Sequence, residues 1–171
     1  MNGHTIWFTG LSSSGKTTIA NEVASNLRFM DISVVVLDGD KVRDKISSDL
    51  GYTKEERDKH IIRVADICRL ITDNDVLNIA CVISPTRKIR EYARNNISNF
   101  SEVYIKCSLK ECQKRDAKGY YKMYKEGNIK DFVGMNVPYE EPLNPELVLD
   151  TEKHVLNHCV YKLLKYIVAI K

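Results

Sequence analysis

The chain has 171 residues, of which 43% are hydrophobic and 29% charged, and its formal net charge is +3. This size and composition predict one globular domain over residues 1–171, and so small a net charge gives no reason to expect nucleic-acid binding. No run of 18 apolar residues occurs, so we expect no membrane-spanning segment and no membrane partner.

Short apolar runs alternate along the chain with longer segments of helical periodicity. We expect strands over residues 5–9, 33–37, 76–83, 102–107 and 146–149, because Val- and Ile-rich runs suit a parallel sheet that is covered on both faces. We expect helices over residues 17–29, 54–72, 86–95 and 153–170, where apolar residues recur three and four positions apart. The alternation predicts a three-layer α/β/α fold of P-loop NTPase type, with a doubly wound, mainly parallel five-stranded sheet.

The first predicted strand leads into a segment that fits the pattern G-x-x-x-x-G-K-[ST] over residues 10–17. Its two glycines let successive backbone N–H groups point at phosphate oxygens, and the helix that follows adds its positive N-terminal end. We expect Lys16 to bridge the β- and γ-phosphates of ATP and the Thr17 hydroxyl to ligate Mg²⁺. The ATP site predicted from this loop consists of Gly10, Ser12, Ser13, Ser14, Gly15, Lys16, Thr17 and Thr18.

The second predicted strand ends in Asp38-Gly39-Asp40. Carboxylates at the C-terminal end of a parallel strand lie where doubly wound sheets bind their ligands. We predict that Asp40 is a general base for an attacking hydroxyl and that Asp38 supports Mg²⁺ through water, so that both are catalytic together with Lys16. The alternative is that these aspartates cap a helix. The sequence lacks the guanine-reading N-K-x-D of GTPases, which favours a kinase.

Residues 117–145 break the alternation of strands and helices. They contain three of the four prolines, three glycines, several lysines and several aromatic residues, with little apolar period. A segment this long inside a compact domain is usually functional or disordered. We therefore predict a lid over an anionic, ring-bearing ligand, with a solvated surface excursion as the alternative.

The five cysteines are odd in number and form no C-x-x-C pair. They are predicted to be small buried residues in a reducing compartment, rather than a disulfide or zinc framework. The N-terminus also lacks the basic and apolar stretches of a signal peptide. These observations predict a cytoplasmic protein.

Motifs along nearly the whole chain resemble those of the adenylylsulfate kinase (APS kinase) family. They are the P-loop, D-G-D-K-V-R at 38–43, D-L-G-Y-T at 49–53, I-S-P at 83–85, R-D-A-K-G-Y-Y at 115–121, and F-V-G with P-Y-E-E-P and N-P-E-L within 132–147. The resemblance implies an ATP- and Mg²⁺-dependent kinase that phosphorylates the 3′-hydroxyl of a small-molecule nucleotide. The expected reaction converts adenosine 5′-phosphosulfate (APS) to its 3′-phosphate (PAPS) in sulfate assimilation, and the expected assembly is a homodimer.

The resemblance also implies which residues contact the two nucleotides. It places the acceptor's base between Tyr52 and Phe132 and the acceptor's anionic group on Arg43 and Arg57, and it places the ATP adenine near Arg115. The acceptor-binding residues implied in this way are Asp40, Arg43, Tyr52, Arg57, His60, Ser84, Lys122 and Phe132.

Several positions depart from the family pattern. His60 and Ile62 stand where the family usually has Asn and Arg, and that Asn normally helps hold the acceptor. Val133 replaces the usual hydroxyl residue, and Met135-Asn136-Val137 is also unusual. A changed set of donors and acceptors can change substrate choice. The sequence therefore leaves open a different acceptor, such as cytidine diphosphoramidate in capsule biosynthesis. It also leaves open a sugar- or shikimate-like kinase of the same fold and a non-catalytic nucleotide-binding regulatory protein.

Overall fold

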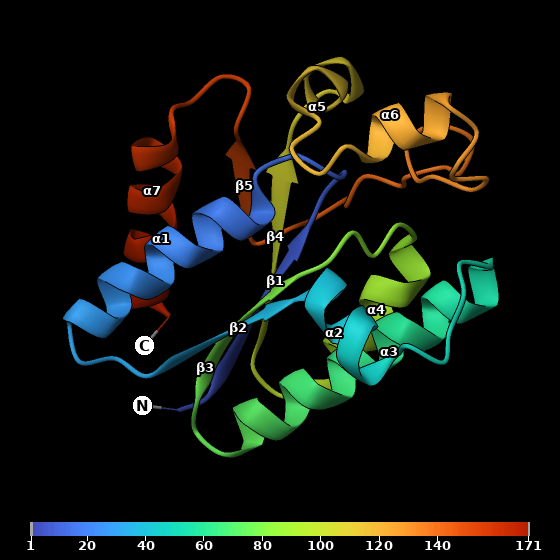
Figure 1. The fold of residues 1–171 in the computed structure, drawn as a ribbon. Coiled ribbons are helices and arrows are strands. Elements are labelled where there is room, and N and C mark those ends of the chain that lie inside the picture. Colours follow the sequence, from blue (N-terminus) through green and yellow to red (C-terminus); the bar gives the residue numbers. More distant parts are fainter. Residues whose placement is uncertain (1, 171) are drawn as a thin grey trace.

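The computed structural model describes residues 2–170, and its centre is a parallel sheet of five strands in the order β2-β3-β1-β4-β5 (Figure 1). The strands are β1 (His4–Thr9), β2 (Val34–Asp38), β3 (Leu77–Cys81), β4 (Phe100–Lys106) and β5 (Leu147–Asp150). Each pairing between them is parallel. The predicted doubly wound, five-stranded sheet is confirmed.

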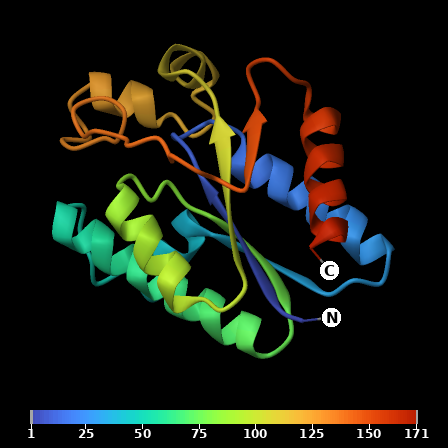
Figure 2. The ribbon, with the colours of Figure 1, turned by 180° about the vertical axis from the view of Figure 1, so that it is seen from behind.

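Helices cover both faces of the sheet (Figures 1 and 2). They are α1 (Lys16–Phe29), α2 (Gly39–Ile46), α3 (Lys54–Asp73), α4 (Arg87–Asn96), α5 (Leu109–Arg115), α6 (Tyr120–Lys125) and α7 (Leu156–Ala169). Successive residues of β1 serve opposite faces, because Ile6 and Phe8 pack with α1 and α7 whereas Trp7 packs with α3 and α4. This two-sided burial explains why the strands are apolar throughout.

The structure has three short helices that the sequence analysis did not predict. They are α2, α5 and α6, of eight, seven and six residues. Helices this short carry too few apolar repeats to show a period. The last helix was predicted from residue 153 but begins at Leu156, because the Asp150 carboxylate accepts hydrogen bonds from the backbone N–H groups of Glu152 and Lys153 and holds a turn there.

Residues 117–145 lie at the edge of the sheet toward which the strands point, and they pack onto the protein body (Figure 1). Tyr121 and Phe132 form an apolar cluster with Cys107 and Cys112. Further along, the backbone N–H of Glu140 donates to the Pro85 carbonyl. The segment is therefore packed onto the domain at these points, while other parts of it are exposed.

The five cysteines are all free and buried, as predicted. Within residues 2–170, the longest helix has 20 residues, and none is both long and apolar enough to cross a membrane.

Candidate active site

The loop between β1 and α1 is wound tightly enough that one glycine is sterically required. A Cβ atom at Gly10 would lie 2.5 Å from the Ile105 carbonyl oxygen of β4, and Gly15 has a left-handed backbone with φ of 103°. Side chains are disfavoured at both positions. The loop therefore brings backbone N–H groups to the N-terminus of α1, where anions are attracted.

Lys16 turns back onto this loop. Its Nζ donates to the carbonyl oxygens of Gly10 at 2.9 Å and Leu11 at 2.7 Å. Burial lowers the pKa of Lys16 to about 8. Ser14 Oγ is buried in the same loop and has no hydrogen-bonding partner within residues 2–170. The Lys16 ammonium is thus bound by neutral carbonyl oxygens, and the Ser14 hydroxyl is unsatisfied. Both groups suit an anionic ligand that accepts hydrogen bonds.

Thr17 and Asp38 join the loop to the end of β2. Thr17 Oγ1 donates to Asp38 Oδ2 at 2.8 Å. Burial favours the neutral acid, but the Thr17 hydrogen bond and the charge of Lys118 keep the pKa of Asp38 below its usual value. The two side chains therefore present adjacent oxygen ligands of the kind that Mg²⁺ prefers.

Asp40 lies at the second position of α2 and forms an ion pair with Lys118. Asp38, and not Asp40, caps the helix, because its Oδ1 accepts the N–H groups of Asp40 and Lys41. The Asp40 carboxylate is thus left to face the segment 117–145, with about half of its side chain exposed. Burial lowers the pKa of Lys118, but the Asp40 carboxylate outweighs this and raises it.

Sequence analysis did not assign Lys118 to the site. The signal was available, because Lys118 lies inside the R-D-A-K-G-Y-Y motif that carries the family resemblance. A lysine in a segment with many lysines does not reveal its partner. Only the fold brings it to a carboxylate 78 positions away in the sequence.

Arg43, Tyr52 and Arg57 lie on the side of the site formed by α2 and α3. The Arg43 guanidinium lies 4.8 Å from the centroid of the Tyr52 ring, and its Nη1 donates to the Gly51 carbonyl at 2.8 Å. Arg57 Nη2 donates to the Asp131 carbonyl at 2.7 Å, directly beside Phe132. Arg57 therefore links this side of the site to the backbone beside Phe132, whose own ring is buried.

Arg115 connects to the P-loop through a residue that the sequence analysis missed. Its Nη1 and Nη2 donate to Oγ1 and the carbonyl of Thr151 at 3.1 and 2.8 Å. Thr151 Oγ1 donates in turn to the Ser14 carbonyl at 2.8 Å. Thr151 therefore links Arg115 to the phosphate-binding loop.

The loop also anchors the segment 117–145 at its beginning. Ser13 Oγ accepts a hydrogen bond from the Ala117 N–H at 3.2 Å, and the Ser12 carbonyl accepts one from the Tyr121 hydroxyl at 3.2 Å. Thr18 is exposed on the first turn of α1.

Three predicted acceptor residues are engaged by other groups or point into solvent in the structure. His60 is 5% exposed and its Nδ1 lies 3.1 Å from Ser47 Oγ, so it supports the end of α2. Ser84 is fully buried, with its Oγ accepting from Trp7 Nε1 at 3.2 Å. Lys122 is 77% exposed, and its Nζ lies 3.9 Å from the Glu126 carboxylate. This geometry therefore gives no support for direct contacts from these three side chains.

A buried ion pair that the sequence analysis did not foresee supports Ser84 and the end of the segment 117–145. Arg90 is 2% exposed and lies 2.6 Å from the Glu102 carboxylate. It also donates to the carbonyls of Ser84 at 2.7 Å and Glu140 at 2.6 Å. One guanidinium therefore fixes three elements at the rim of the site.

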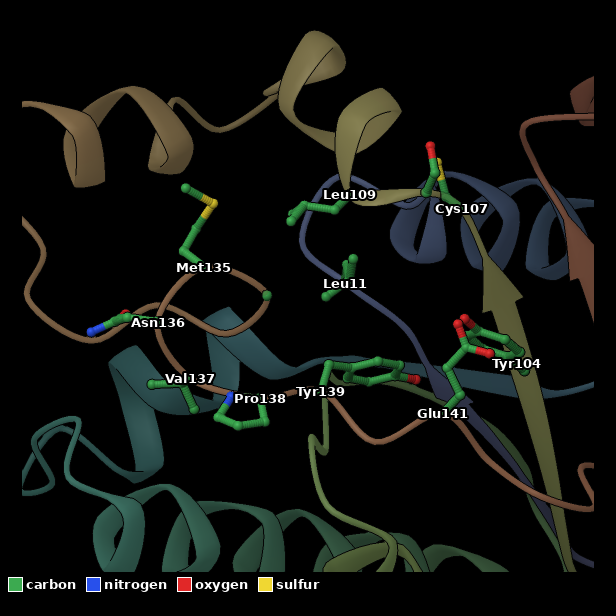
Figure 3. Close-up of a pocket in the computed structure, with 12 residues that line it drawn as sticks. Leu11, Tyr104, Cys107, Leu109, Met135, Asn136, Val137, Pro138, Tyr139 and Glu141 are labelled. Atoms are coloured by element: carbon green, nitrogen blue, oxygen red, sulfur yellow. The ribbon is translucent and has the colours of Figure 1, made fainter.

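A cavity of about 350 Å³ borders the P-loop at Leu11 (Figure 3). Leu11 lies between Leu109 and Tyr139 in its wall, and Met135 and Glu141 also line it. The acidic pair Asp38 and Asp40 does not border this cavity.

Comparison with known proteins is consistent with this geometry. The family model described as "Adenylylsulphate kinase" matches residues 2–150. The adenylyl-sulfate kinase of Clostridium kluyveri is 45% identical over 167 residues, which cover 97% of this chain and 84% of that protein. The enzyme of the same name from Halothermothrix orenii is 44% identical over 165 residues, covering 96% and 89%. The Mycobacterium tuberculosis APS kinase, solved with AMPPNP and APS, superimposes with a TM-score of 0.92 at 34% identity, covering 97% and 98% of the two chains.

Proposed function

The chain belongs to the adenylylsulphate kinase family, and from this premise we propose that it transfers the γ-phosphoryl group of ATP to the 3′-hydroxyl of APS. The observation that carries the proposal is the hydrogen bond from Thr17 to Asp38, which sets Asp40, two residues on, beside the phosphate-binding loop. The tuberculosis relative, solved with an ATP analogue and APS, supports both substrates.

The loop around Lys16 supports ATP as the phosphoryl donor. Lys16 Nζ exchanges the carbonyls of Gly10 and Leu11 for β- and γ-phosphate oxygens, which are stronger, charged acceptors. Ser14 Oγ gains a partner at the same time. Lys16 then neutralises the charge that develops on the transferring group.

Thr17 and Asp38 are the residues that would hold Mg²⁺, since their adjacent oxygens match the preference of this cation. When bound there, Mg²⁺ supplies charge neutralisation for the phosphates of ATP. Asp38 is suited to this role because its low pKa keeps it ionised at neutral pH.

Asp40 acts as the general base. It accepts the proton of the 3′-hydroxyl while the hydroxyl oxygen bonds to the γ-phosphorus and the bond from that phosphorus to the β–γ bridging oxygen breaks. The products are PAPS and ADP, and the proton is on Asp40. Lys118, which pairs with Asp40 before the acceptor binds, supplies a positive charge beside the reacting groups.

The acceptor binds between α2, α3 and the segment 117–145, which we propose acts as a lid. The exposed ring of Tyr52 and the guanidinium groups of Arg43 and Arg57 offer stacking and charge-assisted hydrogen bonds. Arg57 already contacts the lid through the Asp131 carbonyl, so acceptor binding and lid position are coupled.

The case for a cytidine-containing acceptor is weak. It depends on His60 and Val133, and each of these side chains is only 5% exposed. Both side chains therefore offer little surface to a ligand in this conformation. The intact set of Lys16, Thr17, Asp38 and Asp40 likewise speaks against a non-catalytic regulatory protein.

The cytoplasmic location, the role in sulfate assimilation and the homodimer stay predictions from the sequence. Analytical ultracentrifugation of the purified chain would test the dimer directly.

The proposed acceptor is tested by steady-state kinetics with ATP and Mg²⁺, using APS and cytidine diphosphate analogues in separate assays. We expect kcat/KM for APS to be at least about 100-fold higher, because a site built for one nucleotide leaves polar groups unpaired with another. A preference for the cytidine compounds would reject APS while leaving the kinase chemistry in place. Failure to consume ATP with either would reject the kinase.

A further inference from the structure

The turn that follows β3 has a strained backbone at Ser84. The φ angle of Ser84 is 41°, in the left-handed region that residues other than glycine avoid. Pro85 follows directly, and a proline pushes the residue before it toward extended backbone. A conformation of this kind persists only where the surrounding structure holds it in place.

This strained turn borders the candidate active site. β3 lies between β2, which ends at Asp38, and β1, which leads into the P-loop (Figure 1). A Cβ atom at Gly39 would lie 3.0 Å from the Cys81 carbonyl oxygen and 2.9 Å from the Val82 side chain. The chain that leaves β3 therefore runs directly beside the D-G-D segment, at the edge where parallel sheets bind their ligands.

The Arg90 guanidinium holds the turn at Ser84. Its Nη1 donates to the Ser84 carbonyl at 2.7 Å, and Trp7 Nε1 donates to Ser84 Oγ at 3.2 Å. The bond from Arg90 is charge-assisted and therefore the stronger kind. Arg90 is itself fixed, because it is 2% exposed and lies 2.6 Å from the Glu102 carboxylate.

The same guanidinium fixes the end of the segment 117–145. Arg90 Nη2 donates to the Glu140 carbonyl at 2.6 Å. The Glu140 N–H donates to the Pro85 carbonyl at 2.8 Å, and the Glu140 carboxylate accepts from the Arg87 N–H at 2.7 Å. The end of the proposed lid and the strained turn therefore form one bonded unit around Arg90.

Thr9, the last residue of β1, joins this unit to the beginning of the P-loop. Its hydroxyl donates to the Ile83 carbonyl at 2.7 Å. Because its only proton is used there, the Tyr139 hydroxyl is the donor in their 2.9 Å hydrogen bond. The turn, the end of the lid and the entry to the P-loop thus share one hydrogen-bonded framework.

We infer that Arg90 is a positioning residue for phosphoryl transfer, which holds the Ser84 turn and the Glu140 end of the lid in the arrangement that receives the acceptor. The inference rests on the proposed function, because it gives Arg90 a role in the reaction of that kinase. Without Arg90 the strained turn relaxes toward extended backbone beside the D-G-D segment. The acceptor is then held less well, and small misplacements of a reacting group are costly.

The effect falls on the acceptor and not on ATP. Within residues 2–170, the hydrogen bonds of the Arg90 guanidinium reach the turn and the lid, whereas the P-loop keeps its own bonds to Lys16 and Thr151. This separation distinguishes positioning from stability. A variant that is only less stable has fewer folded molecules, so its apparent kcat falls and both KM values stay as they are.

The test is steady-state kinetics of Arg90→Lys, with APS and ATP varied in turn. Lysine keeps a positive charge for Glu102 but lacks the planar fork that reaches two carbonyls at once. We expect KM for APS to rise about tenfold or more and kcat/KM for APS to fall about 10- to 100-fold, with KM for ATP within about twofold of wild type.

A second variant and a control complete the test. The double variant Arg90→Met, Glu102→Met removes the buried pair without leaving a lone carboxylate, and it should show the same rise in KM for APS. Arg94→Lys is the control, because Arg94 lies one turn farther along α4 and pairs with Glu102 at 3.5 Å and Glu146 at 2.6 Å, outside the turn and the lid. Its KM for APS should match the wild type. Thermal melting shows that each variant is folded at the assay temperature.

The outcomes that overturn the inference are distinct from failure of the proposed function. If the wild type phosphorylates APS but Arg90→Lys and the double variant keep both KM values within twofold, Arg90 serves stability alone. An equal rise in KM for APS and for ATP, or an equal rise in Arg94→Lys, also rejects the inference. If the wild type does not phosphorylate APS, the proposed function fails and the inference with it.

Discussion

The Lys118 ammonium pairs with the Asp40 carboxylate, and this ion pair ties the segment 117–145 to the beginning of α2. The pair joins the residue that we assign as general base to the segment that we assign as lid. Opening of the lid therefore exposes Asp40, and closure brings a positive charge to the site of phosphoryl transfer.

The first prediction concerns Lys118. Lys118→Met should lower kcat/KM for APS about 10- to 100-fold, because a positive charge beside the transferring group is lost. ATP affinity should change little, since Lys16 and Thr17 are untouched. Steady-state kinetics and calorimetric titration with an ATP analogue measure the two quantities. Lys114→Met, which removes an 80% exposed lysine of α5, is the control; equal kinetics for the two variants would leave Lys118 with no part in transfer.

The second prediction concerns the general base. Asp40→Asn keeps the shape of the side chain but cannot accept a proton, so kcat should fall about 10²- to 10⁴-fold. The dissociation constant for the ATP analogue should stay close to the wild-type value. The matched control is Asp66→Asn, a half-exposed carboxylate on α3 whose one ion pair within residues 2–170 is a 3.9 Å contact with Arg69. A kcat within twofold of wild type would remove Asp40 from this role.

The third prediction is a pH dependence of stability caused by His60. Burial lowers the pKa of His60 from 6.5 to about 4, so the unfolded chain binds a proton there at pH values where the folded chain does not. His60 therefore leaves the free energy of unfolding unchanged above about pH 6.5. As the pH falls from there toward 4, the free energy of unfolding decreases, by about 3 kcal/mol at most.

Urea denaturation of the wild type and His60→Asn between about pH 7 and pH 4.5 measures this loss. The free energy of unfolding of the variant should fall less steeply over this range. His154→Asn, which changes an exposed histidine, should follow the wild type. Parallel pH profiles for all three proteins would show that His60 is not the source.

The fourth prediction concerns the buried guanidinium of Arg90. Arg90→Met leaves the Glu102 carboxylate buried without its 2.6 Å partner, and the free energy of unfolding should fall by about 3–5 kcal/mol. Arg69→Met breaks only an exposed pair and should cost at most about 1 kcal/mol. Equilibrium urea denaturation measures the free energy of unfolding of both variants. Losses of similar size would mean that the buried ion pair of Arg90 contributes no more to stability than the exposed pair of Arg69.

The phosphate-binding part of the site could be predicted from the sequence because its residues are close together in the chain. Gly10, Gly15, Lys16 and Thr17 lie within eight residues, and their spacing alone determines how they meet a phosphate chain. The sheet could also be predicted from the sequence, because burial on two faces makes each strand a continuous apolar run.

The acceptor side depends on contacts between distant segments and was predicted less well. The sequence does not reveal that Lys118 reaches Asp40 or that Thr151 joins Arg115 to the P-loop. His60 lies next to Ile61 and Ile62 in the chain, and a helical period does not fix whether a histidine turns inward. The structure turns it toward Ser47, at the end of α2.

The position of phosphorylation tests the central claim most directly. The wild-type protein is incubated with ATP, Mg²⁺ and APS, and the product is identified by ³¹P NMR and by its sensitivity to a 3′-specific nucleotidase. We predict one new phosphoryl group on the ribose 3′-oxygen, formed in equal amount with ADP and strongly reduced in Asp40→Asn. Transfer to another oxygen, or ADP formed without a phosphorylated nucleotide, would contradict the account.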